Sequence, residues 1–353
     1  MKYGILTIVK IPNIGAVLQG YALCMKMRSL GIECEIIDYE CVNINQREKA
    51  YHALKNPIKN VAKKMFVWPA TRRRILDCEN FASELYSTTR YNKKNINEAN
   101  ARYDGFVSGS DMIWNLNVTG HDYTFFLDFV DDAKNKFSYA SSIGEQWKQE
   151  DIQNVGMKLN RYSKISVRES DTCKLIQNQL RLPCTTVCDP TMLLDKTEWD
   201  KLVVSINDKN YVLVYFPYKE ILEKAKKYAK KNHKKLVVLG ETFPWKAYQH
   251  VQYKSPQEWI SYIRNADAVF TDSYHGFLFS LYFEKKVWTN NKGNRFKSLL
   301  EELELSKCWI ENDPNFINII DYERCRQLIK NKREYSEQYI IEAVKRAGDA
   351  ECI

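Results

Sequence analysis

One stretch near residue 270 combines residue types that could bind an anionic ligand and pass it a proton. The apolar run Ala268–Thr271 predicts a short strand, and a helix with an apolar face begins a few residues later. The residues at this junction are Asp272, Ser273, Tyr274, His275 and Gly276. Ligands of open α/β sheets bind beyond the carboxyl ends of the strands, and the free N–H groups of a helix N-terminus attract anions. Two interpretations remain open: an anion site, or a helix that Ser273 merely caps while His275 is an ordinary turn residue.

Two arginines could supply positive charge to such a site. Arg168 directly follows the short run Ile165–Val167 and precedes a predicted helix, and Arg295 opens another predicted helix. A guanidinium at a strand end can bind phosphate or carboxylate through two parallel hydrogen bonds. The alternative for Arg168 is an ion pair with Glu169 or Asp189.

Two further strand ends carry polar residues of the kind that bind sugars. The first group follows the first predicted strand and consists of Asn13, Gly15 and Gln19. The second group follows a strand near residue 107 and consists of Ser110, Asp111, Trp114 and Asn115. Sugar hydroxyls need several oriented polar partners, and the apolar faces of sugar rings stack on indoles. A structural turn with a buried Trp114 is the alternative for the second group.

Predicted strands and helices alternate through both halves of the chain. The strand Tyr3–Val9, a helix over Ala16–Leu30 and the strand Ile32–Tyr39 form a first βαβ unit, which predicts a parallel sheet. After a boundary near Pro190 the alternation restarts at Tyr211. We therefore expect an α/β protein of two Rossmann-like parallel-sheet domains, residues 1–190 and 191–353, facing each other across a cleft.

Composition indicates a globular protein. Of 353 residues, 44% are hydrophobic, and the net charge is +9. The ten cysteines are scattered and form no CxxC pair, which indicates free thiols in a reducing cytoplasm. No run approaches the roughly 18 apolar residues that a membrane span needs. The pattern of a nucleic-acid-binding module is also absent, so nucleic acid is not an expected partner.

Much of the positive charge lies between Arg47 and Arg74, where nine Lys or Arg residues occur with a single acidic one. Within it, Lys63–Arg74 mixes basic with bulky apolar residues. This composition suits peripheral contact with the anionic inner face of a membrane. It also suits a plain helix that buries Met65, Phe66 and Trp68 in its own domain, and this is the interpretation that we favour.

Several chemistries lack their sequence signatures. The chain contains no GxGxxG, no P-loop, no DxD pair for a nucleotide-bound metal, and no Ser/His/Asp order of a hydrolase. A metal-independent transferase with an anionic donor fits what remains.

Six ordered motifs resemble those of the polysaccharide pyruvyl transferase family, and together they extend over almost the whole chain. They are Asn13–Leu23, Gly109–Asn115, Ser138–Ser142, Ser166–Glu169, Asp189–Leu194 and Thr271–Gly276. The resemblance implies the fold of two-domain glycosyltransferases of the GT-B type. It implies transfer of a pyruvyl group from phosphoenolpyruvate to a sugar as a cyclic ketal, with release of phosphate, in capsule or exopolysaccharide assembly. No cofactor is expected besides phosphoenolpyruvate, which is the donor substrate.

The resemblance also assigns roles to residues. Arg168 and His275 match the donor-site arginine and histidine of the family, and residues 191–353 are the expected donor side. Many relatives carry an arginine where this chain has Ser273, so Arg295 is our candidate for the second phosphate-binding cation. Ser273, Tyr274 and Gly276 complete the expected donor set. Residues 1–190 are the expected acceptor side, with some donor contacts, through Asn13, Gly15, Gln19, Ser110, Asp111, Trp114 and Asn115. Met112 occupies a position that is commonly glutamine in relatives, which bears on the acceptor contacts.

The expected reaction needs one acid and one base. The methylene carbon of phosphoenolpyruvate must be protonated so that its neighbour becomes electrophilic, and His275 suits that task because an imidazole titrates near neutral pH. Asp111 or Asp272 would take the proton of the attacking hydroxyl, unless Asp272 orients His275 instead.

Two other functions stay open on the sequence alone. One is a GT-B glycosyltransferase that uses a nucleotide sugar in the same pathway, and the other is a sugar-binding protein without catalysis. The expected partners are phosphoenolpyruvate and a sugar acceptor, and the expected location is the cytoplasm. The basic segment Lys63–Arg74 fits a lipid-linked acceptor at the inner membrane face.

Overall fold

The computed structural model of the chain describes residues 1–8, 11–51, 68–216, 219–240, 249–251, 255–313, 315–317 and 319–345. Contacts divide the described residues into two compact units. Residues 1–51, 82–194 and 331–345 form unit 1, and residues 68–81 and 195–330, with the gaps given above, form unit 2.

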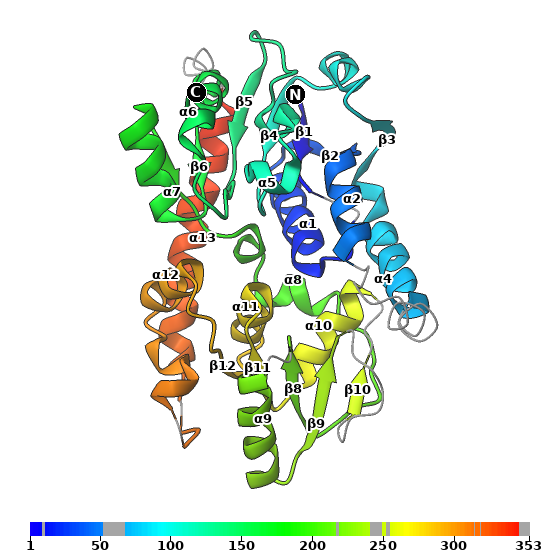
Figure 1. Cartoon of the computed structure of the whole chain (residues 1–353), viewed down its shortest axis with the longest axis vertical. Helices are drawn as coiled ribbons and strands as arrows, with labels where there is room; N and C mark the ends of the chain where they lie inside the picture. Colours follow the sequence, from blue (N-terminus) through cyan, green and yellow to red (C-terminus); the bar gives the residue numbers. More distant parts are fainter. Residues whose placement is uncertain are drawn as a thin grey trace. The chain divides into compact units, whose positions relative to one another are not determined.

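Unit 1 is built on a parallel sheet whose strand order reverses next to β1. Its strands in spatial order are β3 (Tyr86–Tyr91), β2 (Glu33–Tyr39), β1 (Lys2–Leu6), β4 (Gly105–Ser108) and β5 (Asn135–Ser138). The short pair β6 (Ser166–Val167) and β7 (Thr185–Thr186) continues it through bridges from β5 and Ser141. Figure 1 shows β1 between β2 and β4, so the carboxyl ends of β1 and β4 mark the point where the strand order changes direction.

The helices of unit 1 connect these strands. They are α1 (Ile14–Ser29), α2 (Val42–Tyr51), α5 (Leu116–Thr119), α6 (Gln149–Leu159) and α7 (Ser170–Leu175), with short 3-10 turns that include η3 (Tyr123–Phe126) and η5 (Pro190–Leu193). Asn13 starts α1, because its side chain accepts a hydrogen bond from the backbone N–H of Ala16. The helix therefore begins two residues before the predicted Ala16.

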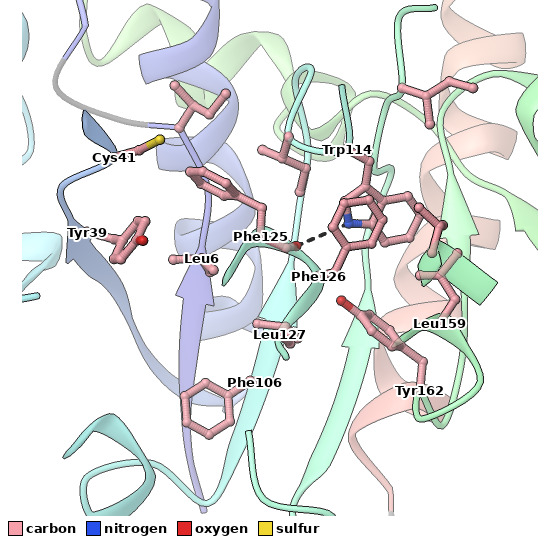
Figure 2. Packing of buried hydrophobic residues seen from close by; sticks show 14 of the residues in the cluster. Leu6, Tyr39, Cys41, Phe106, Trp114, Phe125, Phe126, Leu127, Leu159 and Tyr162 are labelled. Atoms are coloured by element: carbon pink, nitrogen blue, oxygen red, sulfur yellow. Dashed lines mark hydrogen bonds between the residues drawn. The ribbon is translucent and has the colours of Figure 1, made fainter. Parts of the chain in front are cut away.

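Aromatic side chains fill the core of unit 1. The indole of Trp114 stacks on Phe126, with ring centroids 5.4 Å apart, and its Nε1 donates to the carbonyl of Phe125 at 3.1 Å. Figure 2 shows this pair beside Tyr162 and Leu159, with Phe106 and Leu127 nearby. The buried indole N–H thus has the partner that a buried donor requires.

Unit 2 repeats the strand order of unit 1. Its strands are β10 (Gln249–Val251), β9 (Lys235–Leu239), β8 (Tyr211–Tyr215), β11 (Ala268–Thr271) and β12 (Lys286–Trp288), all parallel. Its helices are α4 (Trp68–Asn80), α8 (Lys196–Asp200), α9 (Lys219–Lys231), α10 (Pro256–Asn265), α11 (Tyr274–Tyr282), α12 (Asn294–Glu302) and the first part of α13 (Tyr322–Val344). Here the order changes direction between β8 and β11, which is where the stretch around His275 lies.

Local sequence signals explain several of these elements. Ser255 and Glu258 form a reciprocal capping box at the start of α10. On α9, Ile221, Leu222 and Ala225 are buried while the lysines lie on the outer face. The strands of the sheet are buried, as expected for a parallel sheet covered on both faces.

The chain does not divide at a single cut near residue 190, because the end of α13 belongs to unit 1. The guanidinium of Arg333 donates to the carbonyls of Met192 and Leu194, and the Tyr339 hydroxyl donates to the carbonyl of Ser138 at 2.9 Å. These contacts assign residues 331–345 to unit 1, whereas the sequence placed 191–353 in one domain.

Two further observations concern the whole described chain. The nine cysteines that it contains are free thiols, as expected from their scatter. None of the helices within the described ranges combines the length and the apolar composition that a membrane crossing requires.

Candidate active site

In unit 1, polar residues gather where β1 and β4 end. Gln19 of α1 is fully buried, and its Nε2 donates to the Thr7 hydroxyl at 2.7 Å, directly after β1. Gly15, on the first turn of α1, is buried, whereas Asn13 is exposed and serves as the helix cap. Helix α1 packs on η5, which follows Asp189. The predicted acceptor residues of this loop thus lie beside a segment that is distant in sequence.

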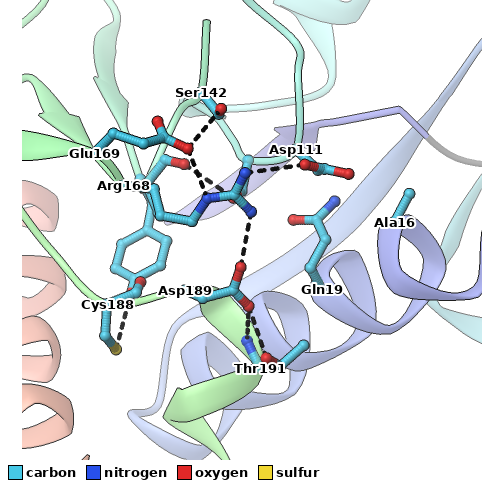
Figure 3. A network of polar contacts seen from close by, with 12 residues as sticks. Ala16, Gln19, Asp111, Ser142, Arg168, Glu169, Cys188, Asp189 and Thr191 are labelled. Carbon is cyan, nitrogen blue, oxygen red and sulfur yellow. Dashed lines mark hydrogen bonds and ion pairs between the residues drawn. The ribbon is translucent and has the colours of Figure 1, made fainter. Parts of the chain in front are cut away.

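Arg168 is the centre of this polar cluster. Its side chain is 2% exposed, and each of its three nitrogens donates to a different carboxylate. Nη2 contacts Asp111 at 3.0 Å, Nε contacts Glu169 at 3.0 Å, and Nη1 contacts Asp189 at 2.8 Å. Figure 3 shows the guanidinium lying between the three acids.

The carboxylates around Arg168 are themselves held by neighbours. Ser142 donates its hydroxyl to Glu169 Oε1 at 2.9 Å, and Thr191 donates both its backbone N–H and its hydroxyl to Asp189 Oδ1. A charge-assisted network of this kind fixes the positions of its members.

Arg168 therefore forms the ion pairs with Glu169 and Asp189 that the sequence left open as an alternative, and Asp111 is its third partner. Three carboxylates thus surround the guanidinium of Arg168. In this arrangement Arg168 positions Asp111 and Glu169.

Trp114 and Asn115 require a correction. Trp114 is fully buried and packed on Phe126, so its indole offers no face on which a sugar could stack. Asn115 is 3% exposed and uses its side-chain oxygen to cap α5, accepting from Val118 N at 3.0 Å. The structure thus shows the alternative interpretation, a structural turn with a buried Trp114.

Ser110 is likewise buried. Its hydroxyl donates to the carbonyl of Ala140 at 2.9 Å, which ties the end of β4 to the segment after β5. Among these four residues, only Asp111 is partly exposed and could reach a ligand.

In unit 2, the end of β11 and the start of α11 form a second polar group. Ser273 caps α11 by accepting from Gly276 N at 3.2 Å. A Cβ on Gly276 would lie 2.9 Å from both Thr271 Oγ1 and Tyr215 Cδ1, so glycine permits the close approach of the helix to β8 and β11. The backbone N–H groups of the first turn of α11 are thereby held at the carboxyl end of the sheet.

His275, Tyr274 and Arg295 lie together at this end of unit 2. His275 is 7% exposed, and its ring meets the ring of Tyr274 edge-on at a centroid distance of 5.5 Å. The guanidinium of Arg295, on the first turn of α12, lies over the Tyr274 ring, with its Cζ 5.2 Å from the ring centroid. The predicted imidazole and the predicted second cation are thus linked through one tyrosine.

Asp272 binds the loop after β12. Its Oδ1 accepts from Asn290 N at 2.7 Å and from the Thr289 hydroxyl at 3.1 Å. Burial raises the pKa of this carboxyl, although the hydrogen bonds from Asn290 and Thr289 oppose the effect. Its observed role is to join the ends of β11 and β12.

The sequence missed several residues of the two groups. Thr7 and Ser142 hold Gln19 and Glu169. Ser142 lies in a short polar run at a strand end, which is a signal that could have identified it, whereas Thr7 stands between Leu6 and Ile8 and carries no such signal. Phe216, directly after β8, is 42% exposed and has φ of 60°. A bulky residue in that conformation at a strand end is unusual and marks a position of interest.

Residues 63–67 of the segment Lys63–Arg74 lie outside the described residues. Within α4, Arg73 pairs with Asp77 at 3.1 Å, and Arg74 is buried. Across the described ranges, no group of three His, Cys, Asp or Glu side chains is arranged to hold a metal ion.

Comparison with known proteins decides the family. A model of the family described as polysaccharide pyruvyl transferase matches residues 13–289. The chain belongs to this family. The matched span contains every predicted site residue of the polysaccharide pyruvyl transferase chain except Arg295. No curated protein matches the chain in sequence.

Solved structures confirm the fold. A putative UDP-N-acetylglucosamine 2-epimerase from Listeria monocytogenes aligns with a TM-score of 0.56 at 10% identity, covering 100% of this chain and 97% of its own. A glycosyltransferase from Rickettsia africae aligns at 0.53 and 9% identity, covering 97% of each chain. The MnaA protein of S. aureus, solved with UDP, aligns at 0.51 and 10% identity, covering 98% of this chain and 96% of its own. The GT-B-like pair of Rossmann-like domains is therefore confirmed.

Proposed function

We propose that the protein transfers a pyruvyl group from phosphoenolpyruvate to a sugar of a capsule or exopolysaccharide precursor. Two sugar hydroxyls add to the enol carbon, the methylene carbon gains a proton to become a methyl group, and the phosphate leaves. The product is a cyclic ketal with a carboxylate. The observation that carries the proposal is the family match over residues 13–289, which includes the polar strand ends of both units.

The donor is proposed to bind in unit 2. Phosphoenolpyruvate carries a phosphate and a carboxylate, so it needs cations and N–H donors. The start of α11 supplies backbone N–H groups and Arg295 supplies a guanidinium beside Tyr274 and His275. Many relatives carry an arginine at the position of Ser273. We propose that Arg295 supplies the positive charge that this arginine would provide.

His275 is proposed to protonate the methylene carbon. It lies on the first turn of α11, next to Tyr274, whose ring also contacts the proposed donor cation. An imidazole is suited to general acid catalysis because it exchanges protons near neutral pH.

Asp111 is proposed to accept the proton of the attacking hydroxyl. Arg168 holds it by one oxygen at 3.0 Å, and its side chain is 12% exposed at the end of β4. A carboxylate fixed in this way is oriented toward its substrate in advance. Arg168 then acts through Asp111 as a positioning residue.

Donor binding can be tested by thermal unfolding of the full chain. Phosphoenolpyruvate should raise the melting temperature, since a ligand at about 100 times its dissociation constant stabilises by about 2.7 kcal/mol. Arg295→Gln should abolish the shift, whereas Lys297→Gln should retain it, because Lys297 is exposed on the same helix and pairs only loosely with Glu301.

The same assay separates the proposal from glycosyl transfer. A panel of nucleotide sugars should leave the melting temperature unchanged. Stabilisation by a nucleotide sugar but not by phosphoenolpyruvate would contradict the proposal and favour a glycosyltransferase.

A further inference from the structure

The outer face of α9 in unit 2 carries a dense group of lysines. Residues 219–235, which comprise α9 and the start of β9, contain eight lysines and two glutamates. Apolar residues of the helix are buried against its own sheet, whereas Lys227, Lys230 and Lys231 are exposed. The helix therefore presents positive charge to the solvent.

The loop that precedes α13 is fixed against this helix. The ring of Phe316 meets the ring of Tyr228 of α9 edge-on, with centroids 5.4 Å apart, and Lys231 Nζ donates to the carbonyl of Asn315 at 3.3 Å. Residues three or four positions apart are neighbours on a helix surface, so Lys224 and Lys231 lie one turn to either side of Tyr228. The loop and the lysines thus belong to one surface.

Two isoleucines of the loop are exposed to solvent. Ile317 is 69% exposed and Ile319 is 82% exposed, and no large hydrophobic residue in the described ranges is more exposed than these two. Single apolar residues are common on protein surfaces, but apolar residues that gather at one place mark an interaction site. Together the lysines of residues 219–235 and the two isoleucines form what we call the α9 surface.

Positive charge exceeds negative charge on the α9 surface when the neighbouring acids are included. Glu223 pairs with Lys226 at 2.7 Å, and Lys234 pairs with Asp267 at 3.1 Å. The loop adds two aspartates: Asp313 is 7% exposed, and Asp321 is exposed and accepts from the first turn of α13. Eight lysines then stand against two glutamates and three aspartates. The surface is suited to an anionic partner.

The aromatic residues at this place are packed inward. Tyr228 is 7% exposed, and Phe316 packs against the hydrophobic core of unit 2. Proteins that bind single-stranded nucleic acid combine positive charge with aromatic side chains on which bases stack, and these two rings are already in contact with each other. A bilayer with anionic headgroups, in contrast, attracts lysines and takes exposed aliphatic side chains out of water.

We infer that the α9 surface is a docking site for an anionic membrane. The lysines interact with lipid phosphates, and Ile317 and Ile319 enter the boundary between the headgroups and the acyl chains. Helix α9 connects the carboxyl end of β8 with the amino end of β9, so its last turn lies at the amino edge of the sheet (Figure 1). Docking there leaves the opposite edge, where His275 follows β11, uncovered.

The test is binding of the full chain to lipid vesicles, measured by co-sedimentation. One preparation is pure phosphatidylcholine, and the other contains about 30% phosphatidylglycerol. At low ionic strength the wild type should bind the anionic vesicles at least about tenfold more tightly than the neutral ones. Because salt screens exposed charges, about 0.5 M salt should weaken this binding at least about fivefold.

Two variants assign the binding to the α9 surface. Lys224→Gln combined with Lys227→Gln and Lys230→Gln should weaken binding to the anionic vesicles at least about tenfold, since each basic residue near such a membrane contributes about fivefold. Ile317→Ser combined with Ile319→Ser keeps the charge and should weaken it about tenfold or more, because the inserted apolar area is lost. The melting temperature of both variants should stay close to that of the wild type, since all five side chains lie at the surface.

Matched controls remove the same groups from unit 1. Lys93→Gln, Lys94→Gln and Lys174→Gln together remove three exposed charges, and Val42→Ser with Met157→Ser removes two exposed apolar side chains. Both controls should bind the anionic vesicles within about twofold of the wild type.

Equal binding to the two vesicle preparations, no binding to the anionic one, or wild-type binding by either α9-surface variant would overturn the inference. A single-stranded oligonucleotide that binds more tightly than the anionic vesicles would also overturn it and identify a nucleic-acid surface. Since neither phosphoenolpyruvate nor a sugar is present, the result is independent of the proposed transfer reaction.

Discussion

The role of Arg168 depends on neighbours that are far away in the sequence. Asp189 lies 21 residues and Asp111 lies 57 residues from it, yet both contact its guanidinium. Viewed alone, an arginine after a strand is as suited to a phosphate as to an ion pair. Arg168 forms ion pairs because the ends of three strands, β4, β6 and β7, come together at one edge of the sheet.

The structure perturbs the ionisation of Asp272 at the candidate site. Burial raises its pKa above 3.8, against the opposing effect of the hydrogen bonds from Asn290 and Thr289. A raised pKa in the folded state means that the folded protein binds the proton more tightly than the unfolded chain does. The stabilising contribution is then present below the unfolded pKa and is lost as the pH rises through the folded value.

Asp272→Asn should therefore become more stable than the wild type as the pH rises. The asparagine keeps an oxygen for Asn290 and Thr289 but has no charge to bury. Each unit by which the pKa is raised corresponds to about 1.4 kcal/mol at neutral pH. Chemical denaturation between pH 3 and 7, at intervals of about half a pH unit, measures the difference.

Asp171→Asn, at an exposed position of α7, is the matched control for the loss of one carboxylate. A wild type that gains stability relative to Asp272→Asn as the pH rises would show that the hydrogen bonds to Asp272 outweigh its burial.

At the scale of elements, the first turn of α11 depends on how closely it approaches the sheet. Gly276 permits this approach, because any Cβ there would press on Thr271 and Tyr215. The capping serine, the histidine and the N–H groups of the helix are all placed by this one contact.

Gly276→Ala should destabilise the protein by about 1–3 kcal/mol, as expected for overpacking at a close contact. The same variant should weaken binding of phosphoenolpyruvate, since the first turn of α11 must shift. Urea denaturation and the thermal-shift assay report the two effects.

Gly156→Ala on α6 provides the comparison. Its added Cβ would meet only the end of the flexible Leu180 side chain, at 3.1 Å, and alanine favours the helix by up to about 1 kcal/mol over glycine. Equal stability of Gly276→Ala and the wild type would refute the close contact at α11.

The alternation of strands and helices was predictable because each strand is short, apolar and followed by a capped helix. The cap at Asn13 and the capping box at Ser255 are local signals, and so is the polar run after β11. The burial of Trp114 was not predictable, since it depends on Phe126, which η3 brings back over the indole. The return of α13 to unit 1 likewise depends on Ser336 and Tyr339, whose partners lie at Cys188 and Ser138.

At the scale of the whole molecule, the two units have the same strand order and a polar group where that order reverses. In open α/β sheets this is where ligands bind. The group in unit 1 is rich in carboxylates around Arg168, and the group in unit 2 combines His275, Tyr274 and Arg295. The two groups therefore differ in the kinds of charged residue that they contain.

The most direct test of this account is the transfer reaction itself. The full chain is incubated with phosphoenolpyruvate and with free and lipid-linked glycans, while phosphate release and the mass of the acceptor are followed together. We predict equal amounts of phosphate and of acceptor carrying one pyruvyl ketal, with the rate lowered about 100-fold or more in His275→Ala. Phosphate release without ketal, an unchanged rate in His275→Ala, or a glycosyl product formed from a nucleotide sugar would contradict it.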